Sequence, residues 1–107
     1  MEGTESQIEW AERIKQNVSI EFASVAASFT TIALRQPPEA RSETEAVIAI
    51  LEEKRNEVMK NDRAGYFITE WQEINDQVRQ LIFQDARYQA IKDQRAARQS
   101  GNSKEKQ

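Results

Sequence analysis

Five acidic residues stand at spacings that would suit a divalent metal ion. Glu52, Glu53 and Glu57 fall in one predicted helix, and Glu73 and Asp76 fall in the next. Carboxylates about one helical turn apart present their oxygens on one face, and oxygen atoms are the ligands that Mg²⁺ prefers. The chemistry that these residues suggest is therefore metal-assisted hydrolysis.

The form EE-x-x-x-E followed by E-x-x-D resembles the MazG-like nucleotide pyrophosphohydrolases over about 25 residues. The resemblance implies a small all-α oligomer that holds Mg²⁺ for attack on a nucleoside triphosphate. Its metal ligands would be Glu53, Glu57, Glu73 and Asp76. The first motif of that family is EE-x-x-E, so the spacing here is one residue longer. Glu73 and Asp76 also lie on the side of their helix away from its apolar stripe. We favour the simpler interpretation, a solvated acidic helix face.

The residue types that the chain lacks exclude several other chemistries. Its 107 residues include no histidine and no cysteine, which excludes a Ser-His-Asp triad, a thiolate nucleophile and a disulfide. The three glycines are isolated from one another, so there is no glycine-rich phosphate-binding loop. We therefore expect no catalytic residues and no cofactor.

The charge of the chain is mildly acidic, but one end is basic. The net charge of −3 argues against a dedicated nucleic-acid binder. Residues 85–107 nevertheless carry six basic side chains against three acidic ones. Arg87, Arg95 and Arg98 in this segment could contact phosphates or an acidic partner. Basic residues also favour the negative end of a helix dipole, which explains the same charges without a partner. Nucleic-acid binding is therefore a secondary hypothesis.

Nothing in the sequence suggests a membrane partner. The first ten residues, MEGTESQIEW, are acidic and polar, unlike a secretory signal. The uncharged run at residues 22–34 has thirteen residues, fewer than the ~20 that span a bilayer as a helix. We expect a cytoplasmic protein.

The chain is predicted to be all-α, because apolar residues recur every three or four positions and no convincing strand pattern occurs. Pro37 and Pro38 should end the first helix. The S-x-x-E sequences at Ser6 and Ser42 have the form of capping boxes, and Gly65 suits a left-handed helix end. The predicted helices cover about 7–35, 43–62 and 67–98, within a single domain at 6–98 between a flexible start at 1–5 and a disordered tail at 99–107.

Two of these helices are long for so short a chain. At about 1.5 Å per residue, the first and third each extend about 43–45 Å. A compact chain of this length has a radius of gyration of only about 13 Å. We therefore predict an elongated three-helix antiparallel bundle, with two long helices and one shorter, that forms oligomers.

The first helix is apolar on two nearly opposite faces. One stripe includes Val18, Phe22 and Phe29. The second face comprises Ile20, Ala23, Ser24, Ala27, Thr31 and Leu34. A helix that is apolar on opposite faces is usually buried on both. Either the other helices of the chain cover both faces, or a second copy covers the second one. We favour a second copy, because a two-fold contact brings the same patch to itself and small residues allow close approach.

Two aromatic residues stand at or beyond the edges of the apolar stripes. Trp10 and Phe83 could be contact residues, since aromatics are enriched in interfaces, or could simply widen the buried arc of their helices. The candidate contacts to another protein are thus Trp10, Phe83, Arg87, Arg95 and Arg98. We predict a non-enzymatic protein-interaction module, acting as a homo-oligomer, that serves as a regulator, inhibitor or assembly factor. The pyrophosphohydrolase and the nucleic-acid binder are the alternatives.

Overall fold

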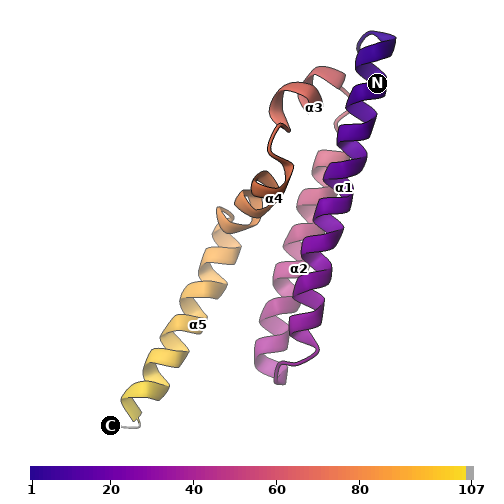
Figure 1. Cartoon of the computed structure of the whole chain (residues 1–107). Helices are drawn as coiled ribbons and strands as arrows, with labels where there is room; N and C mark the ends of the chain where they lie inside the picture. Colours follow the sequence, from indigo (N-terminus) through magenta and orange to yellow (C-terminus); the bar gives the residue numbers. More distant parts are fainter. Residues whose placement is uncertain (106–107) are drawn as a thin grey trace.

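The computed structural model describes the backbone of residues 1–105 and the side chains of residues 1–99. Its helices are α1 (Glu5–Ala33), α2 (Pro38–Met59), α3 (Ala64–Glu70), α4 (Ile74–Phe83) and α5 (Ala86–Glu105), as Figure 1 shows. Within the described part of the chain, an isolated bridge between Glu2 and Arg63 is the sole β feature. The predicted all-α class is confirmed, but the predicted number of helices is wrong. In the same residues, no helix is both long enough and apolar enough to cross a bilayer.

The long helices α1 and α2 form an antiparallel hairpin. The predicted break at Pro37 and Pro38 is confirmed, and Pro38 becomes the first residue of α2, where its missing N–H leaves no bond unmade. The hydroxyl of buried Thr44 hydrogen-bonds Gln36 Oε1 at 2.6 Å, and Arg41 Nε donates to the Ala33 carbonyl at 3.0 Å. These bonds fix the short connection between the two helices.

The caps of α1 and α2 differ from those predicted. A capping box does begin α1, but it is formed by Thr4 and Gln7, two residues earlier than Ser6 and its partner. The N–H of Gln7 donates to Thr4 Oγ1 at 3.3 Å, and the N–H of Thr4 donates to Gln7 Oε1 at 3.0 Å. Ser42, predicted to cap the second helix, lies inside α2, because Pro38 already provides a favourable start.

The first residues of the chain contact the loop between α2 and α3. The N–H of Glu2 donates to the Asp62 carbonyl at 2.9 Å, and the N–H of Ala64 donates to the Glu2 carbonyl at 3.0 Å. Gly3 has a φ of 144°, and a Cβ there would stand 3.0 Å from the Ala64 Cβ. Gly65, predicted to be a left-handed cap, is instead an ordinary residue of α3.

The predicted third helix is three helices, and the break at Trp71 has a tertiary cause. Trp71 leaves helical geometry (φ −112°, ψ 58°) and buries its indole against Phe22, with ring centroids 6.3 Å apart. A second break follows α4, where the Asp85 carboxylate accepts the N–H of Arg87 at 2.8 Å in the manner of an N-cap. The backbone of α5 then continues to Glu105, past the start of the predicted disordered tail. Residues 106 and 107 of that tail lie outside the described residues.

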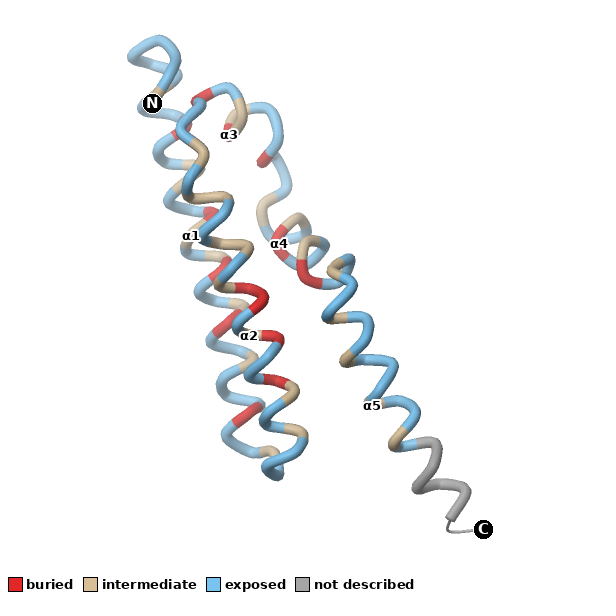
Figure 2. Tube along the Cα trace, turned by 180° about the vertical axis from the view of Figure 1, so that it is seen from behind, coloured by how far each residue is buried: buried red, intermediate tan, exposed pale blue. Residues whose placement is uncertain are grey.

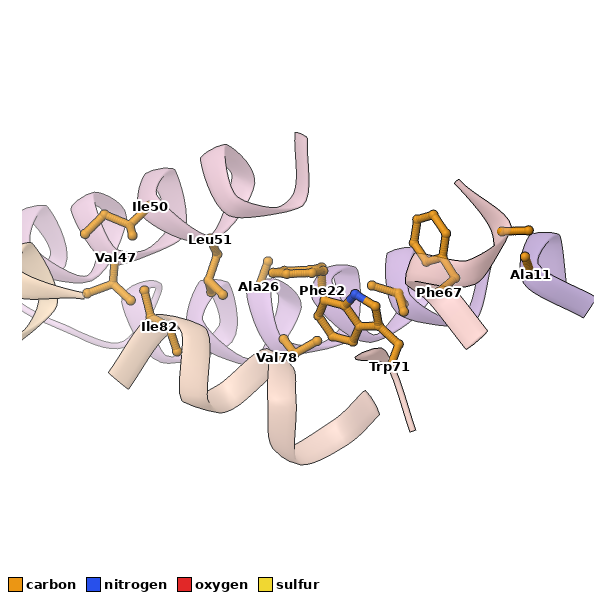
Figure 3. Close-up of a cluster of buried hydrophobic side chains, with 12 residues drawn as sticks. Ala11, Phe22, Ala26, Val47, Ile50, Leu51, Phe67, Trp71, Val78 and Ile82 are labelled. Atoms are coloured by element: carbon orange, nitrogen blue, oxygen red, sulfur yellow. The ribbon is translucent and has the colours of Figure 1, made fainter. Parts of the chain in front are cut away.

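One apolar cluster joins α1, α2, α3 and α4. Figure 3 shows Phe22 and Trp71 at its middle, with Val78 and Ile82 of α4 directed at the hairpin. α5 only borders this cluster: its Tyr88 and Ile91 are partly buried against it, and Figure 2 shows no buried residue along the described part of α5. The molecule measures 65 × 22 × 18 Å with a radius of gyration of 17.6 Å, well above the ~13 Å of a compact chain of this length.

Candidate interaction surfaces

The outer face of α1, which we define as Ile20, Ala23, Ser24, Ala27, Thr31 and Leu34, is exposed along its whole length. Ile20 is 58% exposed and Leu34 is 72% exposed. The helices that contact α1, which are α2, α3 and α4, pack on its opposite side, around the buried residues Val18 and Phe22. The alternative in which the chain covers both of its own apolar faces is therefore wrong. Cover by a second copy stays a prediction.

Several hydroxyls in the C-terminal half of α1 are bonded to the helix itself. The hydroxyls of Ser28, Thr30 and Thr31 donate to the carbonyls four residues earlier, at 3.2, 2.9 and 3.1 Å. A hydroxyl bonded to its own helix in this way has no donor left for water or a partner. The segment from Phe22 to Leu34 therefore carries no charge, and three of its four hydroxyls already donate to the helix backbone.

A second apolar surface, the α1–α4 groove, lies where α4 packs on the inner side of α1. This groove of about 190 Å³ is lined by Val25, Ser28, Phe29, Ile32, Arg79, Ile82 and Phe83. Phe83, one of the predicted contact residues, is 44% exposed and leans on Tyr88 with ring centroids 5.5 Å apart. Arg79 makes no ion pair or side-chain hydrogen bond with any described residue, so its guanidinium is available at the rim. The sequence missed this groove, because the break at Trp71 that turns α4 onto α1 cannot be seen in the local pattern.

The basic residues predicted to contact a partner instead form ion pairs with acidic residues of α2 in the same chain. α5 runs antiparallel to α2, and ion pairs connect the two helices near each end; we call them the α2–α5 ion-pair ladder. At the start of α5, Asp85 accepts Lys54 Nζ at 3.0 Å. Beside it, Arg87 contacts Glu53 at 2.6 Å. The hydrogen bond from Arg87 holds the pKa of Asp85 well below its ordinary value, and Lys54 adds to that effect.

The other end of the ladder is built around Glu43. Arg98 contacts Glu43 at 2.7 Å and Glu39 at 3.4 Å, and Arg95 Nε lies 3.5 Å from Glu43. The hydrogen bond from Arg98 lowers the pKa of Glu43, and in turn Glu43 raises the pKa of Arg98. Arg87, Arg95 and Arg98 thus attach α5 to α2. This use of their charges does not favour binding to phosphates.

The structure does not bring the predicted metal ligands together. Glu53 is paired with Arg87, whereas Glu73 and Asp76 stand at the start of α4, where they suit the positive end of its dipole. Among the described side chains, no three acidic residues are grouped so that they could hold a metal ion. The cause is the break at Trp71, which places Glu73 and Asp76 on a separate short helix. The geometry therefore gives the metal-assisted reaction no support.

Trp10, the remaining predicted contact residue, lies on α1 away from the cluster and is more than half exposed.

No protein-family model, curated protein or solved structure matches this chain. Two largely apolar surfaces, the outer face of α1 and the α1–α4 groove with Arg79 at its rim, are thus the features of the described residues that a partner could use. Both expose apolar side chains that a partner could bury.

Proposed function

We propose that this protein is a non-enzymatic helical interaction module, a regulator, inhibitor or assembly factor, that acts as a homo-oligomer through the outer face of α1. One observation carries the proposal: Ile20 and Leu34 are 58% and 72% exposed on a face with no charged residue between them. Contiguous exposed apolar surface of this kind marks sites of association, whereas single exposed apolar residues are ordinary.

The other protein, in this proposal, occupies the α1–α4 groove. Charge and shape define its chemistry: an apolar helical segment with one carboxylate placed opposite Arg79. Such a segment would cover Phe83 and Ile32, which are both more than two-fifths exposed. Amphipathic helices commonly bind in apolar grooves between two helices.

Molar mass in solution tests the self-association. The parent chain should show a weight-average mass above that of the monomer, rising with concentration in sedimentation equilibrium. Ala27→Glu places a charge at the middle of the outer face and should return the protein to a monomer with unchanged helix content. Ala49→Glu is the matched control, because Ala49 is an exposed alanine in the middle of α2, and it should behave as the parent does. A parent that stays monomeric at every concentration, or an Ala27→Glu variant with the mass of the parent, would overturn the proposal.

A further inference from the structure

We infer that two copies of the chain pair through the outer face of α1 as antiparallel helices, related by a two-fold axis beside Ala27. The inference rests on the proposed self-association and adds its orientation and register. It is drawn from the sizes of the side chains on the outer face and from the charges that flank them.

The outer face is symmetric in size about Ala27. Ile20 and Leu34 lie seven residues to either side of it, and Ala23 and Thr31 lie four residues to either side. Seven residues are close to two full turns, so Ile20, Ala27 and Leu34 form one nearly straight stripe along α1. Its smallest member stands at the middle.

An antiparallel two-fold contact uses that symmetry directly. Ile20 of one copy would face Leu34 of the other, Ala23 would face Thr31, and Ala27 would face itself. Small residues at the crossing point allow helix axes to approach to about 8 Å, the close end of the usual range. The bulky residues then fill the space on each side, where the axes move apart.

Charge distinguishes this arrangement from a parallel one. A parallel pair in register would also match sizes, but it would overlap α1 along its whole length. Glu9 and Arg13 continue the outer face toward the N-terminal end and are both exposed. Each would then oppose its own copy, and like charges in direct opposition are unfavourable. In the antiparallel pair, Ile20 of one copy lies opposite Leu34 of the other, just past the end of that copy's α1 at Ala33. The contact therefore stops near Ile20, and Glu9 and Arg13 lie outside it. In the antiparallel pair the dipoles of the two α1 helices also point in opposite directions, which is the favourable arrangement for helices side by side.

The overlap of residues 20–34 extends about 21 Å along the helix, which makes a contact smaller than a standard protein interface. We therefore expect a weak pair, with dissociation in the micromolar range or above. A covalent trap is the suitable probe. Because the chain has no cysteine, each introduced thiol is the sole one in its copy.

Three single-cysteine variants read out the orientation by disulfide formation under mild oxidation. Ala27→Cys should form a disulfide dimer, because residue 27 faces itself. Ala23→Cys and Thr31→Cys, carried on copies with tags of different size, should form mixed dimers at least several-fold more than either forms with itself. Cysteines form a disulfide only when their Cα atoms lie within about 7 Å, which makes the register readable. Ala49→Cys on α2 is the control for random collision.

Each outcome separates the inference from the proposal beneath it. If Ala23→Cys and Thr31→Cys each prefer their own kind, or show no preference, the antiparallel register is refuted while self-association stands. If Ala27→Cys is trapped no more than Ala49→Cys and sedimentation shows a monomer, both the register and the proposed function are refuted. Preferential mixed dimers together with a concentration-dependent mass support both.

Discussion

Replacing Phe22 with alanine tests whether one apolar cluster holds the first four helices together. The side chain of Phe22 is 1% exposed and packs edge-on to Trp71 at 6.3 Å between ring centroids. Removing a buried phenylalanine costs about 3–5 kcal/mol, because transferred apolar area is lost and a cavity remains. A domain of this size has a free energy of unfolding of about 5–15 kcal/mol, and an elongated one belongs near the lower end. We therefore expect the Phe22→Ala variant to be barely folded at 25 °C.

Urea unfolding followed by tryptophan fluorescence measures the change. Trp71 is buried and Trp10 is exposed, so a Trp10→Phe background leaves a signal from the cluster alone. Phe83→Ala in the same background is the matched control. Its ring is 44% exposed and contacts Tyr88, so its loss should cost only about 1 kcal/mol. If Phe22→Ala lowers the free energy of unfolding by no more than Phe83→Ala does, the described cluster is not what stabilises the fold.

Two further predictions concern α5 and the α1–α4 groove. Glu43→Gln should speed amide hydrogen exchange in α5 severalfold, whereas Glu57→Gln, an exposed residue of α2 outside the ladder, should not. Because Arg98 lowers the pKa of Glu43, the charged carboxylate is the form that the fold favours. Protection of α5 against exchange should then be constant from pH 7 to about pH 5. It should be lost as the pH falls below the ordinary glutamate pKa of about 4.3, because the carboxylate is then protonated and its attraction to Arg98 disappears. Helical peptides selected from a random library on the groove should carry an acidic residue, and Arg79→Glu should shift the selection to basic residues; a selection that ignores this charge would exclude Arg79 as a contact.

The hairpin could be predicted because local chemistry determines its limits. Pro37 and Pro38 cannot continue a helix whatever surrounds them, so the break between α1 and α2 follows from the sequence alone. The break at Trp71 could not be predicted in the same way. The segment around it has an acceptable helical pattern, and the chain leaves that geometry only because the indole packs on Phe22, nearly fifty residues earlier. Tertiary burial here outweighs local helix preference.

The same difference between local and tertiary causes applies to the candidate surfaces. The outer face of α1 follows from the periodicity of one helix, and the structure finds all of its members exposed. From the sequence alone the arginines of α5 are predicted to be available for a partner, because the acidic residues that they contact, Glu39, Glu43 and Glu53, are distant in the chain. Only the antiparallel course of α5 along α2 brings those charges together.

The two faces of α1 are apolar in different ways, and the difference follows from what each one packs against. The inner face carries Phe22, which is buried in the cluster that joins four helices, and Phe29, which packs against that cluster. Side chains of that length would hold a single partner helix away. The outer face instead places Ala23 and Ala27 at its middle and larger residues only at its ends, a pattern that favours close approach of one straight helix. The described helices that contact α1 are α2, α3 and α4, and all of them pack on its inner side, so a helix that covered the outer face would have to come from another molecule.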